Sequence, residues 1–444
     1  MNRYKEYKKV ELPYLHEVPE HWTVRRISTI FELRKEKNKP IKTENILSLS
    51  AKYGVTLYSE RIEKGGNKPK EDLTAYNICH EGDILLNCMN IVAGSVGISK
   101  YFGAISPVYY ALKVRDDNVS SKYMEYLFRN YNFQRSLVGL GKGIQMSETD
   151  DGRLYTVRMR ISWDSLKTQE FIVPPFKEQE QIANYLDWKI SEINKLIKIE
   201  KEKITELKKA FNKKIQFNYN LFDSRLIKLK FLLKEKLKYG LNVSGNLTGE
   251  YRYIRITDID KNGKLKDDNK LFVDIEDDNF VLQKGDVLFA RSGATVGKTY
   301  IFNDSEKCSF AGYLIRARVS DKIIPKYLYD YTNTADYEEW KDSIFIKSTI
   351  QNISAEKYND LLIPVIDLEK QKIVVANNQK VYEQYTDLID LTNKKIEELK
   401  SLKQSLISEV VTGKIDVRNI NIPIFEAVDI EEDIDLEELI EEEN

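Results

Sequence analysis

The chain has 444 residues, of which 42% are apolar and 31% are charged, and its formal net charge is −1. This length exceeds what one hydrophobic core usually supports, so at least two domains are expected, and the apolar fraction excludes a wholly disordered chain. The sequence has no apolar run long enough to span a membrane, and its first residues lack the apolar core of a secretion signal. We therefore expect a cytoplasmic protein that has no membrane partner.

Charge is distributed unevenly along the chain. Residues 426–444 contain 11 acidic residues and no basic one, which leaves 69 basic against 59 acidic residues in the preceding 425. The main part of the chain therefore carries about ten excess positive charges, which suits a polyanionic partner. The acidic end is expected to act as a solubilising tail.

Three segments of the first half recur in the second half, in the same order and at a spacing near 190–203 residues. The first match is loose and joins residues 26–33 to residues 228–234. In the second, Gly82-Asp83-Ile84-Leu85-Leu86 matches Gly285-Asp286-Val287-Leu288-Phe289, and a Val-Gly pair follows each segment. Gly-Asp predicts a turn, and the apolar run after it predicts a buried strand.

The third match predicts two long helices. Val173-Pro174-Pro175-Phe176 and Ile363-Pro364-Val365-Ile366 each precede a helical pattern, approximately residues 178–220 and 368–411, and residues 203–208 match residues 395–400 at five of six positions. Narrow apolar stripes at three- and four-residue steps predict a coiled-coil seam on each helix. The stripe residues are Ile193, Ile197, Ile204, Leu207 and Phe211, then Tyr385, Leu388, Ile396, Leu399, Leu402 and Leu406.

The sequence therefore predicts an α+β protein with an internal pseudo-twofold repeat. Each repeat is a mixed α/β domain followed by one long helix. Two helices of similar length, each with one seam, are expected to pair as an antiparallel coiled coil that separates the two domains. A helix of about 38 residues is about 57 Å long, at about 1.5 Å per residue.

Short motifs of several enzyme classes occur, but each lacks a residue that the chemistry needs. Residues 292–299 resemble a nucleotide-binding loop, yet Ser292 replaces the first glycine, and the residues that follow favour a strand where that loop needs a helix. The Val173-Pro174-Pro175-Phe176 segment resembles the signature of adenine methyltransferases, with Val173 in place of the polar residue that holds the target amino group. Two E-x-K tripeptides, at residues 206–208 and 398–400, lie on charged helix faces.

The residues that commonly bind metals or act as nucleophiles form no recognisable site. Cys79, His80 and Cys88 do not have the spacing of zinc ligands. The chain has three cysteines, Cys79, Cys88 and Cys308, which are too few for a disulfide framework. His16, His21 and His80 have no triad partners in recognisable motifs. We expect no catalytic residue, no metal and no cofactor.

Four segments carry a resemblance to a known family. They are Pro19-Glu20-His21-Trp22, the Gly82 segment with its copy at Gly285, residues 173–183, and the ending Leu406-Ile407-Ser408-Glu409-Val410-Val411-Thr412-Gly413-Lys414-Ile415. In this order, across about residues 15–418, the chain resembles the specificity subunits of type I restriction–modification enzymes. The likeness departs in two places: Lys370-Gln371 stands where the first helix has Gln179-Glu180, which predicts a weaker match at the second helix start, and the first copy has an extra stretch near Glu148–Arg160.

The resemblance implies a non-catalytic subunit of a type I restriction endonuclease and adenine methyltransferase complex. Each target-recognition domain would read one half of a bipartite site in double-stranded DNA, and the helices would act as a ruler and as a docking surface. The implied partners are two methyltransferase subunits, joined by nuclease–translocase (restriction) subunits. The expected divisions are target-recognition domain 1 at 1–175, a central helical spacer at 176–222, target-recognition domain 2 at 223–364, a C-terminal helical spacer at 365–418 and an acidic tail at 419–444.

Candidate DNA-contacting residues are polar side chains in loops between the predicted strands. Arg and Lys suit guanine, Asn and Gln suit adenine, and Lys, Arg and Ser suit phosphate. Arg291 and Gln351 are the strongest candidates, because each lies in a polar loop of the repeated pattern. The candidates are Lys64, Asn67, Lys68, Lys70, Asn87, Asn90, Lys142 and Gln145 in the first repeat, and Tyr239, Asn242, Arg252, Arg255, Arg291, Ser292, Lys347, Ser348 and Gln351 in the second.

Two alternatives belong to other classes of protein. The chain could be the DNA-reading part of a self-contained restriction–methylation enzyme, but the two repeats already account for nearly its whole length. It could also be a coiled-coil scaffold without DNA binding, but a scaffold has no need for two large, divergent domains in a shared pattern. That divergence predicts two different half-sites and hence an asymmetric target.

Overall fold

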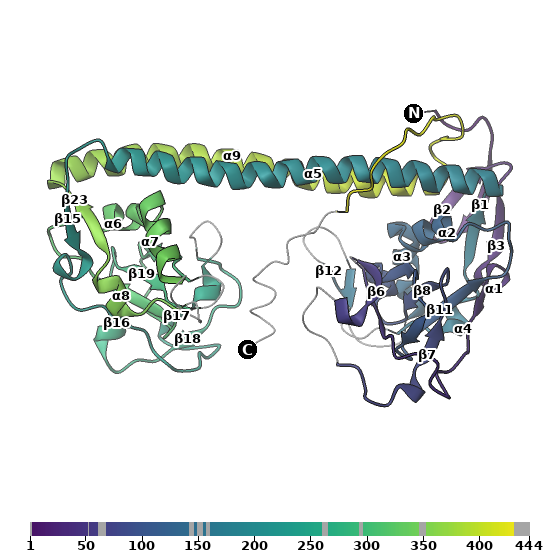
Figure 1. Ribbon diagram of the computed structural model, residues 1–444, viewed down its shortest axis with the longest axis horizontal. Helices are drawn as coiled ribbons and strands as arrows, with labels where there is room; N and C mark the ends of the chain where they lie inside the picture. The colour runs from purple at the N-terminus through teal and green to yellow at the C-terminus, as the bar shows by residue number, and fades with distance from the viewer. Residues whose placement is uncertain are drawn as a thin grey trace. The chain divides into compact units, whose positions relative to one another are not determined.

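The structure, a computed structural model, describes residues 2–51, 53–60, 68–141, 146–148, 154–156, 160–259, 265–292, 296–345 and 352–429. Two compact units divide the chain. Unit 1 is formed by the described residues of Met1–Ile199 and Lys395–Glu432, and unit 2 by those of Glu200–Lys394. Each unit contains one mixed α/β domain and a part of both long helices (Figure 1).

The two long helices are α5 (Phe176–Tyr219) and α9 (Leu368–Val411), each of 44 residues. Their bounds lie within two residues of the predicted 178–220 and coincide with the predicted 368–411. Because the two helices have equal length, they correspond position by position, with Phe176 equivalent to Leu368 and Tyr219 to Val411. In the part of the chain that the structure describes, no helix is long and apolar enough to cross a membrane.

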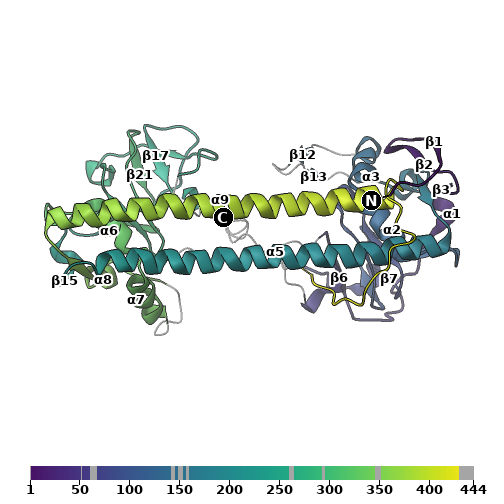
Figure 2. The same cartoon turned by 90° about the horizontal axis from the view of Figure 1, so that it is seen from above.

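In each unit the two helices lie side by side and run antiparallel (Figure 2). In unit 1, Lys403 Nζ donates to Asn194 Oδ1 at 3.1 Å, which joins the last third of α9 to the first half of α5. In unit 2, Asn218 Nδ2 donates to Asn378 Oδ1 at 2.8 Å, and the ring of Phe211 stacks on Tyr385 at 4.5 Å. A late residue of one helix therefore meets an early residue of the other in both units.

The predicted seam of α9 was wrong at two positions. Leu388 and Leu402 are 44% and 53% exposed, whereas Ile389 and Thr392 are buried at 7% and 1%. The more buried side follows a heptad through Tyr385, Ile389, Thr392, Ile396, Leu399, Lys403 and Leu406, with steps of three and four residues. Leu388 and Leu402 each precede a seam position by one residue, which turns them about 100° away around the helix.

The domain of unit 1 is built on the four-stranded antiparallel sheet β4-β11-β8-β9. Two-stranded sheets β1-β2, β3-β14, β5-β6, β7-β10 and β12-β13 and four short helices surround it. The elements are β1 (Tyr7–Leu12), β2 (Leu15–Pro19), β3 (Thr23–Arg26), α1 (Ile27–Ile30), β4 (Phe31–Leu33), β5 (Leu47–Ser50), β6 (Gly54–Leu57), β7 (Asn77–Cys79), β8 (Ile84–Asn87), β9 (Val96–Ile98), β10 (Gly103–Ile105), β11 (Tyr109–Val114), α2 (Ser121–Phe128), α3 (Tyr131–Ser136), β12 (Met146–Glu148), β13 (Leu154–Thr156), α4 (Trp163–Leu166) and β14 (Glu170–Val173).

The domain of unit 2 repeats this plan with the four-stranded sheet β16-β22-β19-β20. A three-stranded sheet β18-β17-β21 and the pair β15-β23 complete its strands. The elements are β15 (Arg225–Lys228), β16 (Lys238–Tyr239), β17 (Tyr251–Ile254), β18 (Phe272–Val273), β19 (Val287–Ala290), β20 (Thr299–Ile301), β21 (Cys308–Phe310), β22 (Leu314–Ala317), α6 (Pro325–Tyr331), α7 (Ala335–Phe345), α8 (Ala355–Asn359) and β23 (Leu362–Val365).

The two Gly-Asp segments form the predicted turns and lead into buried strands. Gly82 and Gly285 have φ angles of 83° and 93°, which favour glycine, and each aspartate accepts the backbone N–H three residues before it, at 2.9 Å for Asp83 and 2.8 Å for Asp286. An arginine also binds each buried carboxylate through two nitrogens at 2.7–2.8 Å, Arg34 in unit 1 and Arg318 in unit 2. We call these duplicated turns with strands β8 and β19 the repeated frame.

A fully buried glutamine joins each long helix to the domain in front of it. Gln179 accepts from the Ser120 N–H at 2.9 Å and donates to the carbonyls of Asn118 and Pro174 at 3.0 and 2.8 Å. Gln371 makes the same three bonds, to Ile324 N–H at 2.8 Å and to the carbonyls of Lys322 and Ile366 at 3.1 and 2.9 Å. The predicted weaker match at the second helix start was therefore wrong: Gln371 is the counterpart of Gln179, one position later than the sequence comparison placed it.

A C-terminal strap, residues 412–429, follows α9 and lies along α5 in unit 1. Gln181 Nε2 donates to the carbonyls of Val417 and Ile420 at 2.9 and 2.8 Å, and Asn194 Nδ2 donates to the Val428 carbonyl at 2.7 Å. At the start of the strap, Gly413 lies so close to Pro19 and Trp22 that a Cβ atom there would come within 2.6–2.9 Å of them. Both ends of the chain therefore contribute to the core of unit 1.

We expect Gln371→Leu to lower the free energy of unfolding of unit 2 by about 2–4 kcal/mol, because it leaves one buried N–H and two buried carbonyls without partners. Urea unfolding followed by circular dichroism measures the loss, and hydrogen exchange of α6 peptides assigns it to unit 2. Gln379→Leu is the matched control, since Gln379 is exposed on the same helix and bonds only Glu383, at 3.0 Å. Equal free energies of unfolding for both variants would contradict this role of Gln371.

Candidate nucleic-acid interface

Arg291 follows strand β19 and is held by its backbone between two neighbouring segments. Its N–H donates to the Tyr313 carbonyl at 3.0 Å, and its own carbonyl accepts from the Ile353 N–H at 2.8 Å. The guanidinium carbon lies 4.9 Å from the centre of the Tyr239 ring, within the range of a cation–π contact. Within the described residues Arg291 Nε is buried and has no hydrogen-bond partner. The side chain is thus fixed in place while part of its donor capacity stays unused.

Three further residues complete this site in unit 2. Ser292 forms an antiparallel bridge with Asn352, whose Oδ1 is buried and unpartnered in the part of the chain described. Tyr239, 38% exposed at the end of β16, accepts the Ala355 N–H through its hydroxyl at 2.9 Å. We name Tyr239, Arg291, Ser292 and Asn352 the Arg291 cluster. The structure brings together three of the predicted residues here, and it adds Asn352, which sequence reasoning missed although it follows Gln351 directly.

Asn242 lies near the same site. A Cβ atom on Gly312 would overlap Asn242 Oδ1, so the absence of a side chain at Gly312 makes room for this amide. The next residue, Tyr313, is 63% exposed, and its carbonyl holds the Arg291 backbone. An exposed amide, an exposed tyrosine and the partly buried guanidinium of Arg291 therefore lie close together. The predicted residues Lys347, Ser348 and Gln351 lie outside the described residues.

Two predicted arginines of unit 2 are engaged inside their own domain instead. Arg252 is only 5% exposed; its guanidinium donates to the Lys266 carbonyl and lies 3.4 Å from Glu306. Arg255 donates to Asp258 through Nε at 3.2 Å and through Nη2 at 2.7 Å, beside a short 3₁₀ helix. Guanidinium groups engaged in this way have fewer donors left for a base edge, and a DNA contact of either residue stays a prediction.

The predicted residues of unit 1 are less concentrated. Lys68 and Lys70 are exposed, and the Lys70 N–H donates to the Tyr76 hydroxyl at 3.1 Å. Asn87 ends strand β8 and accepts the Met89 N–H at 3.0 Å, while Asn90 is exposed just before a short 3₁₀ helix. Lys64, Asn67, Lys142 and Gln145 lie outside the described residues. Within the described part of unit 1, the predicted side chains form no cluster comparable to that around Arg291.

The repeated frame relates the two units position by position. Cys88 makes the backbone bonds of Arg291: its N–H donates to the Val108 carbonyl at 3.1 Å, and its carbonyl accepts the Ile161 N–H at 2.9 Å. Ser162 and Ser354, which follow Ile161 and Ile353, accept from the N–H three residues ahead and begin helices α4 and α8. Burial raises the pKa of the Cys88 thiol, so this position is uncharged in unit 1 and cationic in unit 2. The same backbone position thus presents different chemistry in each unit.

The motifs that resemble enzyme sites do not gather catalytic groups in the described residues. No group of three or more His, Cys, Asp or Glu side chains there could hold a metal ion. Thr299–Ile301 forms strand β20, as the sequence predicted for the residues after the loop-like motif. Glu206 forms an exposed pair with Lys209 at 2.7 Å, and His21 and His80 contact Glu178 and Glu36, each at 2.8 Å.

Comparison with known proteins identifies the family. The chain matches the type I restriction modification DNA specificity domain twice, over residues 19–209 and 231–401. It is 24% identical over 453 residues to the type I restriction enzyme MjaVIII specificity subunit of Methanocaldococcus jannaschii, covering 94% of this chain and 98% of that one. It is also 25% identical over 164 residues to the type I restriction enzyme StySPI specificity subunit of Salmonella potsdam, covering 35% of each chain.

A solved structure supports the same fold. This structure is described as the structural basis underlying complex assembly and conformational transition of the type I R-M system. It has a TM-score of 0.62 to this chain at 14% identity, and the match covers 90% of this chain and all of the other. The fold is therefore shared across nearly the full length. Because the two domain matches also cover more than half of the sequence, the chain belongs to the family of type I restriction–modification specificity subunits.

Proposed function

We propose that this specificity subunit is non-catalytic and reads an asymmetric, bipartite site in double-stranded DNA, one half with each mixed domain. The observation that carries the proposal is that the two units share a backbone arrangement but differ in a side chain on it: Cys88 in unit 1 and Arg291 in unit 2 occupy the same backbone position. An arginine there can bind guanine through two donors, whereas a buried thiol cannot. A shared support with divergent contact residues is what two different half-sites require.

Helices α5 and α9 are proposed to act as the spacer between the two DNA-reading domains. Each has 44 residues and so is about 66 Å long, at about 1.5 Å per residue. Half-sites one helical turn apart on DNA are separated by about 34–36 Å, and two turns by about twice that distance. Helices of this length exceed the one-turn spacing and come close to the two-turn spacing.

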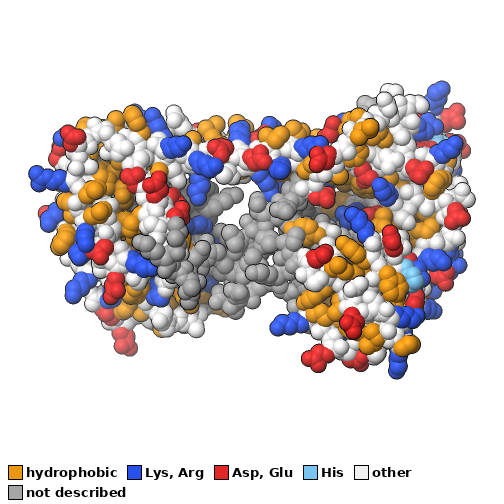
Figure 3. Space-filling view, in the orientation of Figure 1, with side chains coloured by type: hydrophobic (Ala, Val, Ile, Leu, Met, Phe, Trp, Pro, Cys, Tyr) orange, Lys and Arg blue, Asp and Glu red, His pale blue; other side chains and the backbone are white. Residues whose placement is uncertain are grey.

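The same helices are proposed to dock two methyltransferase subunits, which restriction subunits then join. Hydrophobic side chains lie among charged ones along the helices (Figure 3). Leu196 and Ile199 on α5 are 49% and 56% exposed, and the residues at the equivalent positions of α9, Leu388 and Leu391, are 44% and 62% exposed. Two equivalent apolar pairs, one on each helix, provide two equivalent places for one kind of partner subunit.

We expect a host strain that lacks this gene to lose methylation at one asymmetric, bipartite adenine motif. The physical reason is that the methyltransferase subunits would then have no component that selects a DNA sequence. Methylation sequencing of genomic DNA from the parent, the deletion strain and a complemented strain provides the measurement. An unchanged set of methylated motifs in the deletion strain would argue for the scaffold alternative.

We expect Arg291→Ala to weaken binding to cognate DNA by about 1–3 kcal/mol and to relax preference at one base pair. Arg291→Lys should keep part of the affinity and lose the preference, since an ammonium lacks the paired donors of a guanidinium. Binding of labelled duplexes that carry single base changes measures both quantities. Arg225→Ala, which removes an exposed arginine from strand β15 of the same unit, is the control. An Arg291→Ala protein with wild-type affinity and preference would remove Arg291 from the interface.

We expect Leu196→Glu and Leu388→Glu each to lose one of two bound methyltransferase subunits, and the double variant to lose both. A carboxylate placed at the centre of an apolar contact is costly to bury without a partner. The mass of the complex in native mass spectrometry reports the number of copies. Leu402→Glu makes the same change at an exposed leucine whose counterpart on α5 is Ala210, so it should keep both copies. Two copies bound to the double variant would place docking elsewhere.

A further inference from the structure

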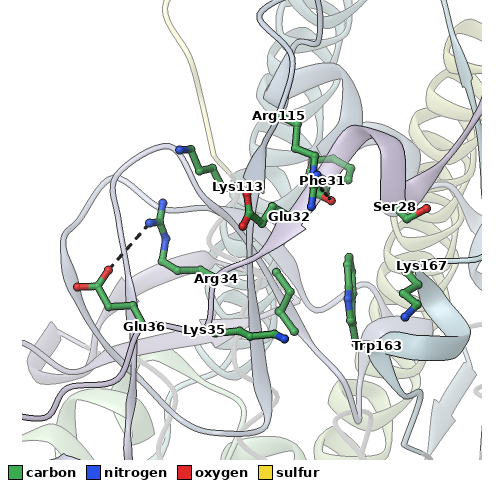
Figure 4. A pocket seen from close by; sticks show the side chains of 11 residues that line it. Ser28, Phe31, Glu32, Arg34, Lys35, Glu36, Lys113, Arg115, Trp163 and Lys167 are labelled. Atoms are coloured by element: carbon green, nitrogen blue, oxygen red, sulfur yellow. Dashed lines mark hydrogen bonds and ion pairs between the residues drawn. The ribbon is translucent and has the colours of Figure 1, made fainter.

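A pocket of about 570 Å³ opens in unit 1 beside strand β4, the edge strand of the four-stranded sheet (Figure 4). Strand β4 with the residues after it, the end of β11, and helix α4 supply its walls. We call it the Trp163 pocket. Its lining includes Phe31, Arg34, Lys35, Lys113, Arg115 and Trp163.

The pocket is rich in cations, and three of them form no close ion pair with the residues that the structure describes. Five of its lining residues are basic and two are acidic. Two of the cations are neutralised nearby: Arg34 binds Asp83, and Lys167 binds Asp164 at 2.5 Å. Within the described residues the other three cations, Lys35, Lys113 and Arg115, form no ion pair within 4.0 Å, although Lys35 contributes, after Lys167, to lowering the pKa of the Asp164 carboxyl.

The orientation of these three side chains is compatible with an external anion. Arg115 donates through Nε to the Phe31 carbonyl at 3.2 Å, which fixes its stem and leaves its two terminal nitrogens available. Lys113 faces Glu32 across the β4–β11 pair, yet they form no ion pair in the structure. Lys35 is exposed on the segment after β4. Three available cations around one cavity favour a ligand with several negative charges.

Trp163 adds a flat apolar surface to this charged site. It is the first residue of α4, which Ser162 caps, and its indole is partly exposed. The ring centroids of Trp163 and Tyr110 lie 6.2 Å apart in an edge-to-face arrangement. In Figure 4 the ring stands between Lys35 and Lys167. An indole of this kind offers both a packing face and one N–H donor. Cations interleaved with an aromatic ring are typical of nucleic-acid contacts.

A correspondence between the two units gives a second reason to connect this pocket with DNA. Ser162 and Ser354 cap α4 and α8, so Trp163 corresponds to Ala355. The Ala355 N–H is the group that donates to the Tyr239 hydroxyl at 2.9 Å in the Arg291 cluster. One wall of the Trp163 pocket therefore corresponds to the segment that borders the Arg291 cluster in unit 2, whereas Cys88, the counterpart of Arg291, does not line the pocket.

We propose that the Trp163 pocket is the DNA-contact surface of unit 1, where Lys35, Lys113 and Arg115 bind phosphates of the duplex and Trp163 packs on the neighbouring sugar. This inference rests on the proposed function and names the part of unit 1 that carries it. Two of its side chains differ in unit 2. Trp163 corresponds to Ala355. Arg115, whose N–H donates to the Ile30 carbonyl, corresponds to Ser320, whose N–H donates to the Leu232 carbonyl. The two units would thus hold the DNA backbone by different side chains.

The test measures how the affinity of the full-length protein, purified with the subunits it carries, depends on salt. Lys35→Ala combined with Lys113→Ala should reduce the slope of log affinity against log salt by about 1.8, at about 0.9 per lost phosphate contact. The preference for one DNA sequence over another should not change, because phosphates carry no sequence information. Lys5→Ala with Lys9→Ala is the matched control, since it removes the same charge from exposed residues at the N-terminal end of unit 1.

A second measurement uses the indole itself. DNA should change the tryptophan fluorescence of the wild type, and Trp163→Phe, which keeps a ring against Tyr110, should abolish most of that change. If the wild type binds no duplex DNA at any salt concentration, the proposed function fails. If the wild type binds DNA but the pocket variant keeps the slope of the wild type, or Trp163→Phe keeps the full fluorescence change, the inference about the pocket alone is overturned.

Discussion

The structure depends on two buried amide side chains. Gln179 and Gln371 are completely buried, and each bonds one N–H and two carbonyls at the point where a domain passes into a long helix. Burial of a glutamine is favourable only if its polar atoms are satisfied, and these three bonds can form only when domain and helix are in one arrangement. The amide thus couples the direction of each helix to the domain before it. The orientation of each domain relative to the helix that follows it therefore depends on this buried glutamine.

The two units have different side chains at equivalent positions between the long helices. The correspondence between α5 and α9 relates Leu186 to Asn378 and Val410 to Asn218, and all four side chains are buried. In unit 2 the two asparagines bond each other, and Asn378 reaches the buried Asp330 at 3.2 Å. Burial raises the pKa of Asp330, which Lys326 and Asn378 partly offset. Unit 1 has apolar packing in the same layer. A polar layer generally costs stability but restricts which register two helices can adopt.

Sequence reasoning predicted features that depend on local pattern. The predicted bounds of the two long helices agree with the observed bounds within two residues, because a repeated apolar stripe is a strong signal for a helix. The Gly-Asp turns were also predicted, because each depends on one glycine conformation and one short hydrogen bond. Sequence reasoning was wrong about Gln371, which it misaligned by one position, and it could not foresee features that distant residues decide, such as the burial of Arg252 against Lys266 and Glu306. The Trp163 pocket joins residues near 31–36, 113–115 and 163–167, whose proximity no spacing rule reveals.

The make-up of unit 1 from two separate stretches of chain has a consequence for synthesis. Unit 2 is formed by the described part of Glu200–Lys394 alone, whereas unit 1 needs Lys395–Glu432 in addition to Met1–Ile199. Chains emerge from the ribosome at about 5–20 residues per second, and domains generally fold as units. The second domain therefore has all its residues available before the first does. The N-terminal half has to wait, with part of its surface uncovered, until α9 and the strap arrive to complete it.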